Sequence, residues 1–299
     1  VPNGWTAAVL NGTPHINSTQ LWGRGGSCDP ADMRWEKLEG HDSLIMLAYP
    51  PGGSDLAPPF DAAVYQRVAV TPGTAYSLSA WMVSLCGGSA MPNDCPAGYY
   101  LSKLAGLDAT GGTDTRAATV GWVEDRRPHY IARWVNLVTA ATAQSDAMTV
   151  FVRLYSPFSH HGNHGFADAV KLVRAPTAQL TQLQPARDTI SVAWTGSLGP
   201  DIAAIPGGNY RLCFEVEVAA GVAATWQPWL SNQPAGGAVL SIGGSCVDRT
   251  YRFRVRVRAE QPAGEPGARP NHRFISVWQE SAPVRVARTV VCDEQVFLP

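Results

Sequence analysis

The sequence predicts an all-β fold, and three observations support this prediction. Apolar and polar residues alternate with a period of two along several segments, as they do in strands with one face in a core. Turn-forming clusters rich in Gly, Pro and Thr separate these segments, for example at residues 71–74 and 111–114. No stretch carries the apolar periodicity of a long amphipathic helix. Many short strands joined by such turns are typical of β-sandwiches.

The alternation recurs along the whole chain. In residues 76–82, Leu78, Ala80 and Met82 share one face of the predicted strand, and Trp81 lies on the other. The same pattern occurs in three further segments, at residues 148–155, 189–194 and 251–258. The alanine-rich residues 139–144 are interpreted as a strand end and a turn, because β-rich segments flank them.

The chain divides near Ala175 and Pro176, where a terminal strand ends and a second series of strands begins. We therefore expect a first domain at residues 1–175 and a smaller second domain at 176–288. Residues 289–299 follow as an apolar, strand-like tail. A chain of 299 residues is long enough for two domains of ordinary size.

The composition argues against two classes of partner. The formal net charge is -1, with 23 Lys and Arg against 24 Asp and Glu, so a general electrostatic attraction to nucleic acid or to an anionic membrane is not expected. No apolar run reaches the ~18 residues that span a bilayer. We therefore expect no nucleic-acid partner and no membrane insertion. The chain begins at Val1 without a leader, as in a processed protein or a fragment.

Six cysteines suggest disulfide bonds and an oxidising, extracellular or cell-surface location. Cys86 and Cys95 bracket a short polar loop, which predicts a local disulfide, with two free thiols as the alternative. Four more cysteines can pair in three ways, and the sequence does not choose among them: Cys28, Cys213, Cys246 and Cys292.

The second domain resembles a fibronectin type III domain, an immunoglobulin-like sandwich. The resemblance rests on Trp194, on strand-like residues 210–218 and 226–230, and on residues 251–259 and 281–286. It implies that Trp194 is buried in the core and that Tyr251 is a corner tyrosine. Residues 261–273 form a longer loop than this resemblance implies.

One strand of this domain carries arginine at every second position, from Arg252 to Arg258. These side chains could form a stripe that binds anions or nucleic acid. The alternative is a solvated face on which Glu215 and Glu217 of a neighbouring strand are the cross-strand partners. The matched two-residue spacing of the glutamates favours the second interpretation.

The first domain resembles the jelly-roll carbohydrate-binding modules of secreted bacterial proteins. The likeness rests on four stretches, at residues 63–81, 104–122, 134–154 and 163–172. Such modules open with a strand carrying an acidic residue, which often shares a structural calcium ion with the terminal aspartate, here Asp168. This chain lacks that opening run, so either Ca²⁺ is lost or another segment supplies the strand. Without that strand, an unpaired slot would be left beside the terminal strand at Asp168 to Val173, and proteins avoid such open edges. The tail at 290–298 could fill this slot, in its own chain or in a neighbouring copy.

A saccharide site in such a sandwich would combine aromatic faces with charged or amide side chains. Parity along the strands predicts a shared surface for Trp81, Tyr65 and Arg67, joined by Arg153 and Tyr155 and bordered by Trp122. For each tryptophan alone, the alternative is a partly buried packing residue. These six residues are the predicted carbohydrate-binding site: Tyr65, Arg67, Trp81, Trp122, Arg153 and Tyr155.

Other clusters give weaker indications. His160, His161 and His164 could bind a transition metal, but a structural loop is the favoured interpretation of this segment. Asp108 and Asp114 could bind calcium, but a role in turns is the favoured interpretation for both. No nucleophile elbow, HExxH motif or phosphate-binding loop occurs, and no spacing pairs two carboxylates across a cleft. We therefore expect no enzyme.

The expected function is non-catalytic binding of a carbohydrate by the first domain, with the second domain as a spacer. The alternative is a structural subunit of an extracellular assembly or filament, held by strand exchange through the tail at 289–299. A third possibility is an accessory fragment of a larger hydrolase.

Overall fold

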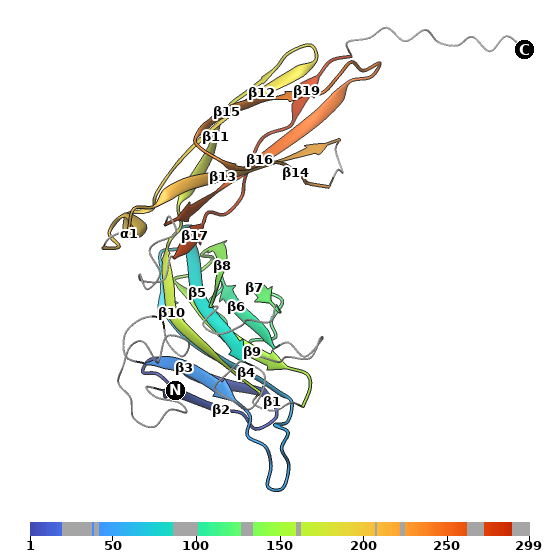
Figure 1. Ribbon diagram of the computed structural model, residues 1–299. Helices are drawn as coiled ribbons and strands as arrows, with labels where there is room; N and C mark the ends of the chain where they lie inside the picture. The colour runs from blue at the N-terminus through green and yellow to red at the C-terminus, as the bar shows by residue number, and fades with distance from the viewer. Residues whose placement is uncertain are drawn as a thin grey trace, which may run out of the picture. The chain divides into compact units, whose positions relative to one another are not determined.

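The computed structural model describes residues 1–19, 38, 42–85, 101–126, 134–159, 163–206, 208–221, 225–261 and 272–288. Strands dominate these residues, and the one helix among them is the single turn α1 (Pro200–Ala203). The all-β prediction is therefore confirmed (Figure 1). In this part of the chain, no helix has the length and apolarity to cross a membrane.

Two compact units make up the chain. The first contains Val1–Arg174 together with Gln261–Phe274, and the second contains Ala175–Glu260 and Ile275–Pro299. The predicted tail at 289–299 lies outside the described residues.

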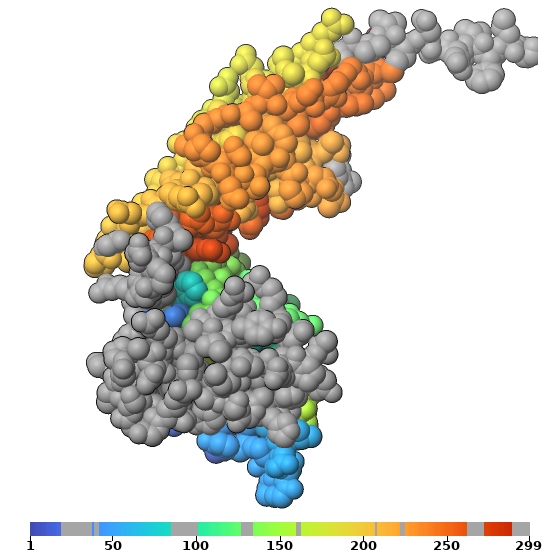
Figure 2. Space-filling model, viewed as in Figure 1, coloured from blue at the N-terminus to red at the C-terminus, as the bar shows by residue number. Residues whose placement is uncertain are grey.

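The first unit is built from two five-stranded antiparallel sheets. Sheet A has the order β1-β4-β9-β6-β7, formed by Thr6–Asn11, Phe60–Ala69, Ala147–Ser156, Ser102–Asp108 and Val120–Asp125. Sheet B has the order β2-β3-β10-β5-β8, formed by His15–Thr19, Ser43–Leu47, His164–Arg174, Ala75–Leu85 and Val135–Thr142. The exposed connection between β3 and β4, around residues 49–56, projects from these strands in Figures 1 and 2.

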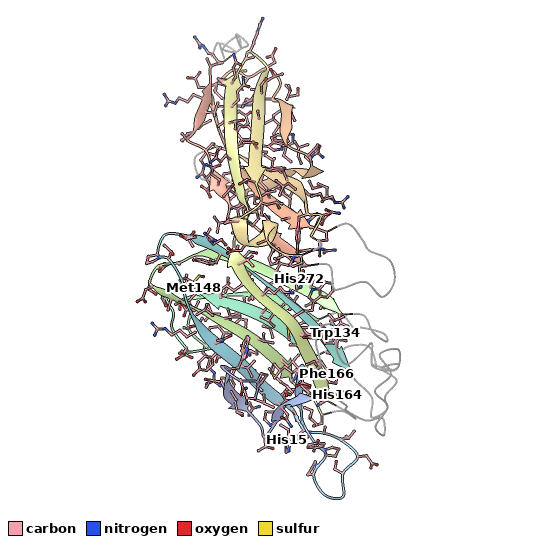
Figure 3. All side chains as sticks on the ribbon, turned by 90° about the vertical axis from the view of Figure 1, so that its left-hand side faces the viewer. His15, Trp134, Met148, His164, Phe166 and His272 are labelled. Carbon is pink, nitrogen blue, oxygen red and sulfur yellow. The ribbon has the colours of Figure 1, made fainter. Side chains whose placement is uncertain are left out.

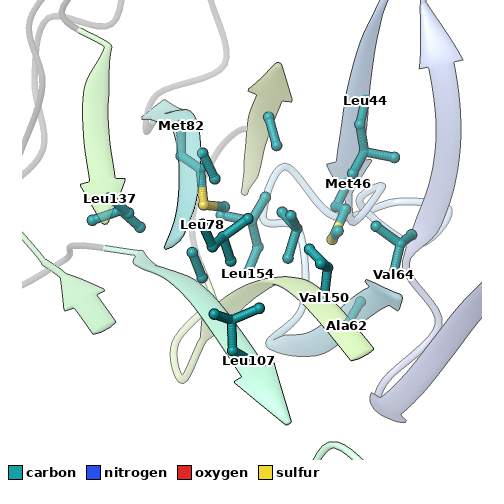
Figure 4. Packing of buried hydrophobic residues seen from close by; sticks show 14 of the residues in the cluster. Leu44, Met46, Ala62, Val64, Leu78, Met82, Leu107, Leu137, Val150 and Leu154 are labelled. Carbon is teal, nitrogen blue, oxygen red and sulfur yellow. The ribbon is translucent and has the colours of Figure 1, made fainter. Parts of the chain in front are cut away.

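The core of this unit lies between the inner faces of the two sheets (Figure 4). Leu78, Ala80 and Met82 of β5 are fully buried there, as the alternation predicts. Sheet A contributes every second residue of β4, β6 and β9, including Val64, Leu107, Val150, Val152 and Leu154. Because side chains alternate along a strand, the residues between these inner positions face outward from sheet A.

Sheet B is also covered on its outer face. A second apolar cluster there contains Ile45, Leu47, Val83, Trp134 and Phe166, with Trp81 and Leu38 partly buried against it. Figure 3 labels Trp134 and Phe166 where they lie on this face.

A polar network continues from this cluster along the same face of sheet B. His272 accepts a hydrogen bond at Nε2 from Lys171 Nζ (2.7 Å), and its Nδ1 lies 3.2 Å from Ser79 Oγ. Asn136 Nδ2 also donates to Ser79 Oγ. These polar side chains on the outer face of sheet B therefore bond to one another.

The strand β10 is flanked unevenly. Its whole length, apart from a bulge between Asp168 and Lys171, pairs with β5, whereas β3 pairs only with residues His164–Ala167. Sequence analysis expected a slot beside residues 168–173, and β3 ends its pairing with β10 at Ala167, before that slot begins.

The second unit also has two antiparallel sheets. One contains β11, β12 and β15, which span Thr177–Pro185, Thr189–Ser197 and Gly236–Ser241. The other has the order β14-β13-β16-β17, spanning Gln227–Gln233, Arg211–Ala220, Arg249–Glu260 and Arg273–Ile275; β18 (Gln279–Glu280) and β19 (Val284–Val286) also pair with β16. Trp194 and Tyr251 are buried in its core, and Trp194 Nε1 donates to the carbonyl of Pro234.

The arginine row of β16 is ion-paired. Arg254 bonds to Glu217, and Arg256 and Arg258 bond to Glu215, so the cross-strand interpretation is confirmed. Two tryptophans complete the row by cation–π contacts: Trp226 lies next to Arg252 and Arg254, and Trp278 next to Arg254 and Arg256. Glutamates thus pair with Arg254, Arg256 and Arg258, whereas Arg252 contacts Trp226 and has a buried Nε without a hydrogen-bond partner among the described residues.

A buried ion pair stabilises the first unit. Lys103 is fully buried, and its Nζ lies 3.4 Å from Asp125 and 3.2 Å from Ser84 Oγ. Removing one partner of such a pair leaves the other charge poorly compensated in the interior. We predict that Asp125→Asn lowers the free energy of unfolding by about 3 kcal/mol in urea denaturation. Asp55→Asn changes an exposed carboxylate and should have little effect. Equal stability of the two variants would contradict the prediction.

Candidate functional site

The outer face of sheet A carries a row of aromatic residues that crosses the strands. Tyr65 of β4 is opposite Phe151 of β9, Phe151 is opposite Gly106 of β6, and Gly106 is opposite Trp122 of β7. The ring centroids of Tyr65 and Trp122 lie 5.8 and 5.6 Å from that of Phe151, so they are at most about 11 Å apart. Phe151 is fully buried, whereas Tyr65 and Trp122 are half-buried. We call Tyr65, Phe151 and Trp122 the aromatic row.

Gly106 lets the indole of Trp122 lie down on the sheet. A Cβ atom at position 106 would be 2.7 Å from Cε3 and 2.8 Å from Cζ3 of Trp122, which is closer than carbon atoms approach one another. The ring therefore occupies the space above the glycine and extends toward Phe151. Any larger residue at position 106 would lift the indole off the strand.

Arg153 lies beside the aromatic row and is held in place from two sides. Its guanidinium group forms a bidentate pair with Asp61, with Nε–Oδ1 and Nη2–Oδ2 distances of 2.7 and 2.5 Å. The same group lies 5.7 Å from the ring centroid of Trp122. Both charged side chains are mostly buried, at 20% and 11% exposed. A bidentate pair of this kind fixes the orientation of the guanidinium plane.

A second ion pair lies on the same face, at Glu124 of β7. Arg126 Nε donates to Glu124 Oε1 at 2.6 Å and to Ser102 Oγ at 3.0 Å. Burial alone would raise the pKa of Glu124, but hydrogen bonds from Ser102 and Arg126, with the positive charges of Arg126 and Arg153, lower it below its usual value. Glu124 is therefore held as a carboxylate.

Two other predicted site residues also face outward from sheet A. Tyr155 is half-buried and lies between Asp61 and Ser102 in the register. Arg67 is exposed and lies two residues from Tyr65 on β4. Sheet A therefore brings together five of the six predicted residues: Tyr65, Arg67, Trp122, Arg153 and Tyr155.

Trp81 does not share this surface, and the expectation that it lies beside Tyr65 and Arg67 is wrong. β5 belongs to sheet B and β4 to sheet A, so parity along one strand says nothing about the surface of the other. Trp81 packs against the apolar cluster on the outer face of sheet B. Its Nε1 is buried there without a hydrogen-bond partner, as is that of Trp134.

Asp168 uses both carboxylate oxygens on the backbone. Oδ2 accepts from the amide of Leu38 at 2.7 Å and Oδ1 from the amide of Ala169 at 2.6 Å. Ala169 has a φ of 49° at the bulge in β10, so Asp168 stabilises a local distortion of the strand. Among the described residues, no group of three His, Cys, Asp or Glu side chains is arranged to hold a metal ion. The calcium ion that the resemblance implies therefore stays a prediction.

The cysteines and histidines are only partly described. Cys213 is a free thiol and takes no part in the pairings left open above, whereas Cys246 is disulfide-bonded. Cys86, Cys95, Cys28 and Cys292 lie outside the described residues, as do His160 and His161. His164 is buried on the outer face of sheet B, with its ring 5.9 Å from that of Phe166. Asp108 accepts hydrogen bonds from Thr110 and Thr119, in the turn role that was expected.

Four residues of this face were missed by sequence reasoning: Asp61, Gly106, Glu124 and Phe151. Phe151 and Asp61 share the parity of Arg153 and Tyr65, and this signal was available in the sequence. Gly106 and Glu124 depend on which strands are neighbours, which the alternation does not reveal.

Comparison with known proteins gives distant structural likenesses only. No protein-family model and no curated protein matches the chain. A solved carbohydrate-binding module, TmCBM61 in complex with β-1,4-galactotriose, is similar over 57% of this chain and 89% of its own, at 13% identity and a TM-score of 0.38. A family 16 carbohydrate-binding module is similar over 46% and 79%, at 17% identity and a TM-score of 0.25.

A β-glucuronidase of Bacteroides uniformis is similar over 95% of this chain but only 32% of its own, at 7% identity and a TM-score of 0.18. Likenesses at these TM-scores define neither a family nor a ligand, so the site is argued from its own geometry.

The contact between Gly106 and Trp122 can be tested by stability. We predict that Gly106→Ala lowers the free energy of unfolding by about 1–3 kcal/mol, because the new methyl group forces the indole to move. Gly121→Ala is the matched control on the neighbouring strand, where a Cβ meets only the Leu107 carbonyl oxygen, at 3.8 Å. Chemical denaturation of both variants measures the difference. Equal losses of unfolding free energy in the two variants would contradict the prediction.

The ion pair at Glu124 predicts a pH dependence. Arg126→Gln removes a hydrogen bond and a positive charge, so the pKa of Glu124 should rise. Because the folded-state pKa is lowered, the pair stabilises the fold above the unfolded-state value and loses this effect as the pH falls through the folded-state value. Carbon-13 NMR of the side-chain carboxyl measures the titration, with Arg116→Gln as control. An unchanged midpoint in Arg126→Gln would contradict the prediction.

Proposed function

We propose that the outer face of sheet A binds a carbohydrate, with Tyr65 and Trp122 as stacking surfaces. The observation that carries this proposal is the indole of Trp122 lying over Gly106, in line with Phe151 and Tyr65. An aromatic face held down on a sheet can stack on the apolar CH face of a sugar ring.

Polar groups for the sugar hydroxyls stand next to the aromatic row. Arg153 follows Phe151 by two residues on β9, and Glu124 follows Trp122 by two residues on β7. Both therefore face outward from sheet A. Their ion pairs fix their positions before a ligand arrives, which lowers the entropic cost of binding. A few oriented polar groups around an apolar surface are what a small-molecule site requires.

The charge state of this face supports binding without catalysis. Glycoside hydrolysis requires one carboxylic acid whose pKa is raised, so that it can give up a proton at neutral pH. The pKa of Glu124 is lowered instead, and Asp61 is engaged by both donor groups of Arg153. Both side chains therefore serve as hydrogen-bond acceptors for neighbouring arginines.

The role of the second unit and the location of the protein are parts of the same proposal. The second unit, with its two packed sheets, serves as a fibronectin-like spacer that presents the first. An extracellular or cell-surface location is supported by the disulfide bond at Cys246, because such bonds persist in oxidising compartments.

The test is binding to a panel of purified polysaccharides, measured by affinity electrophoresis. Trp122→Ala should weaken binding at least tenfold, because it removes the larger stacking surface, and a loss of ~1.4 kcal/mol is tenfold. Trp226→Ala changes a half-buried tryptophan of the second unit and should leave binding unchanged. Binding by no polysaccharide of the panel, or full affinity in Trp122→Ala, would overturn the proposal.

A structural role through strand exchange is the alternative function. The observation that favours it is that, among the described strands, β3 pairs with β10 only from His164 to Ala167. A strand from a second copy, such as residues 290–298, could add beyond Ala167. Light scattering of the full chain and of a chain without residues 289–299 tests this. Polymers that require the tail would support it, and a monomeric full-length chain at all concentrations would exclude it.

A further inference from the structure

Arg67 differs from the other charged residues on the outer face of sheet A. It lies on β4, two residues from Tyr65 and on the same side of the strand. Its side chain is exposed and forms no ion pair or hydrogen bond with any residue that the structure describes. It therefore keeps a full positive charge and all its donors beside one end of the aromatic row.

The two other arginines near the aromatic row are ion-paired. Arg153 is paired with Asp61, and Arg126 with Glu124. Asp108, which lies in the same register row as Arg67, is buried and accepts hydrogen bonds from Thr110 and Thr119. Arg67 therefore differs from Arg153 and Arg126 in having no ion pair with a described residue, and it lies next to Tyr65.

We infer that the carbohydrate bound by this face carries an anionic group, and that Arg67 binds it while the sugar ring stacks on Tyr65. This inference rests on the proposed carbohydrate-binding function. Alternate residues of a strand are ~6.8 Å apart, so an anionic substituent of a ring above Tyr65 falls within reach of the Arg67 side chain. A guanidinium group binds a planar carboxylate or a sulfate oxygen pair through two parallel hydrogen bonds.

Two chemical sources supply such a group: the carboxylate of a uronic acid and a sulfate ester. On the opposite side of the aromatic row, Arg153 and Arg126 are already engaged by Asp61 and Glu124. The ligand is accordingly a glycan with its acidic group at the Tyr65 end.

The experiment compares each acidic polysaccharide with a neutralised form of the same backbone. Polygalacturonate is paired with its fully methyl-esterified form, and a sulfated galactan with its desulfated form. Binding is measured by isothermal titration calorimetry for the wild-type protein, Arg67→Gln and the control Arg285→Gln. Arg285 is an exposed arginine of the second unit, so its replacement removes the same charge elsewhere.

We expect the wild-type protein to bind at least one acidic form more tightly than its neutralised partner. Arg67→Gln should weaken that binding about tenfold, because it removes hydrogen bonds between two charged groups, and Arg285→Gln should not. Dependence on polygalacturonate identifies a carboxylate, and dependence on the sulfated galactan identifies a sulfate.

The failures of the two proposals are distinguishable. Binding to the neutralised forms that equals binding to the acidic forms and is unchanged in Arg67→Gln would overturn the anionic subsite and leave carbohydrate binding in place. Absence of binding to all four polysaccharides, with no effect of Trp122→Ala on any ligand of the wider panel, would overturn both.

Discussion

The register of four neighbouring strands is the constraint on which the candidate site depends. Phe151 on the central strand β9 is flanked by Tyr65 on β4 and by Gly106 on β6, and Gly106 in turn faces Trp122 on β7. A slip of one residue in any pair would move an aromatic side chain of the row to the inner face. The inner positions prevent this slip, because Val64, Val150 and Val152 are buried against sheet B. Packing of the core therefore determines the chemistry of the outer surface.

Charge pairing gives the same surface its rigidity. Asp61 holds Arg153 through two hydrogen bonds, and Arg126 holds Glu124. Exposed pairs of this type contribute little to stability, so their main consequence is orientation. The Asp61–Arg153 pair is mostly buried, and a buried bidentate pair keeps a fixed plane next to the indole of Trp122. A ligand that stacks on Trp122 then meets donors and acceptors whose positions do not have to be ordered on binding.

The architecture could be predicted from alternation, but the neighbour relations could not. Leu78, Ala80 and Met82 are buried as their two-residue spacing predicts, and Glu215 and Glu217 pair with the arginines of β16 as matched spacing predicts. Alternation reveals the two faces of one strand, whereas sheet membership depends on contacts between distant segments. Trp81 shows this limit, since its parity on β5 was correct and its assignment to the surface of β4 was not.

The missed residues of the site follow from the same limit. Gly106 matters only because Trp122 of the adjacent strand lies above it, and nothing in the local sequence of β6 indicates that neighbour. Phe151 could have been included, because it shares a face with Arg153, but an aromatic residue within an apolar strand is more often part of the core. The side chain of Phe151 faces outward from sheet A and is nevertheless fully buried.

The burial of Phe151 explains how a flat sheet can present an aromatic surface at all. Single exposed rings on a strand are free to rotate away, whereas Tyr65 and Trp122 both lie next to a third ring that is fully buried, at tilted angles of 44° and 50°. Contacts between rings at these separations add to the stabilisation from burial. Phe151 thus acts as a positioning residue, which supports the two half-buried rings without being available to a ligand itself. The sheet gains a stacking surface from three residues on three strands, and the glycine on the fourth strand provides the space in which the largest ring can lie flat.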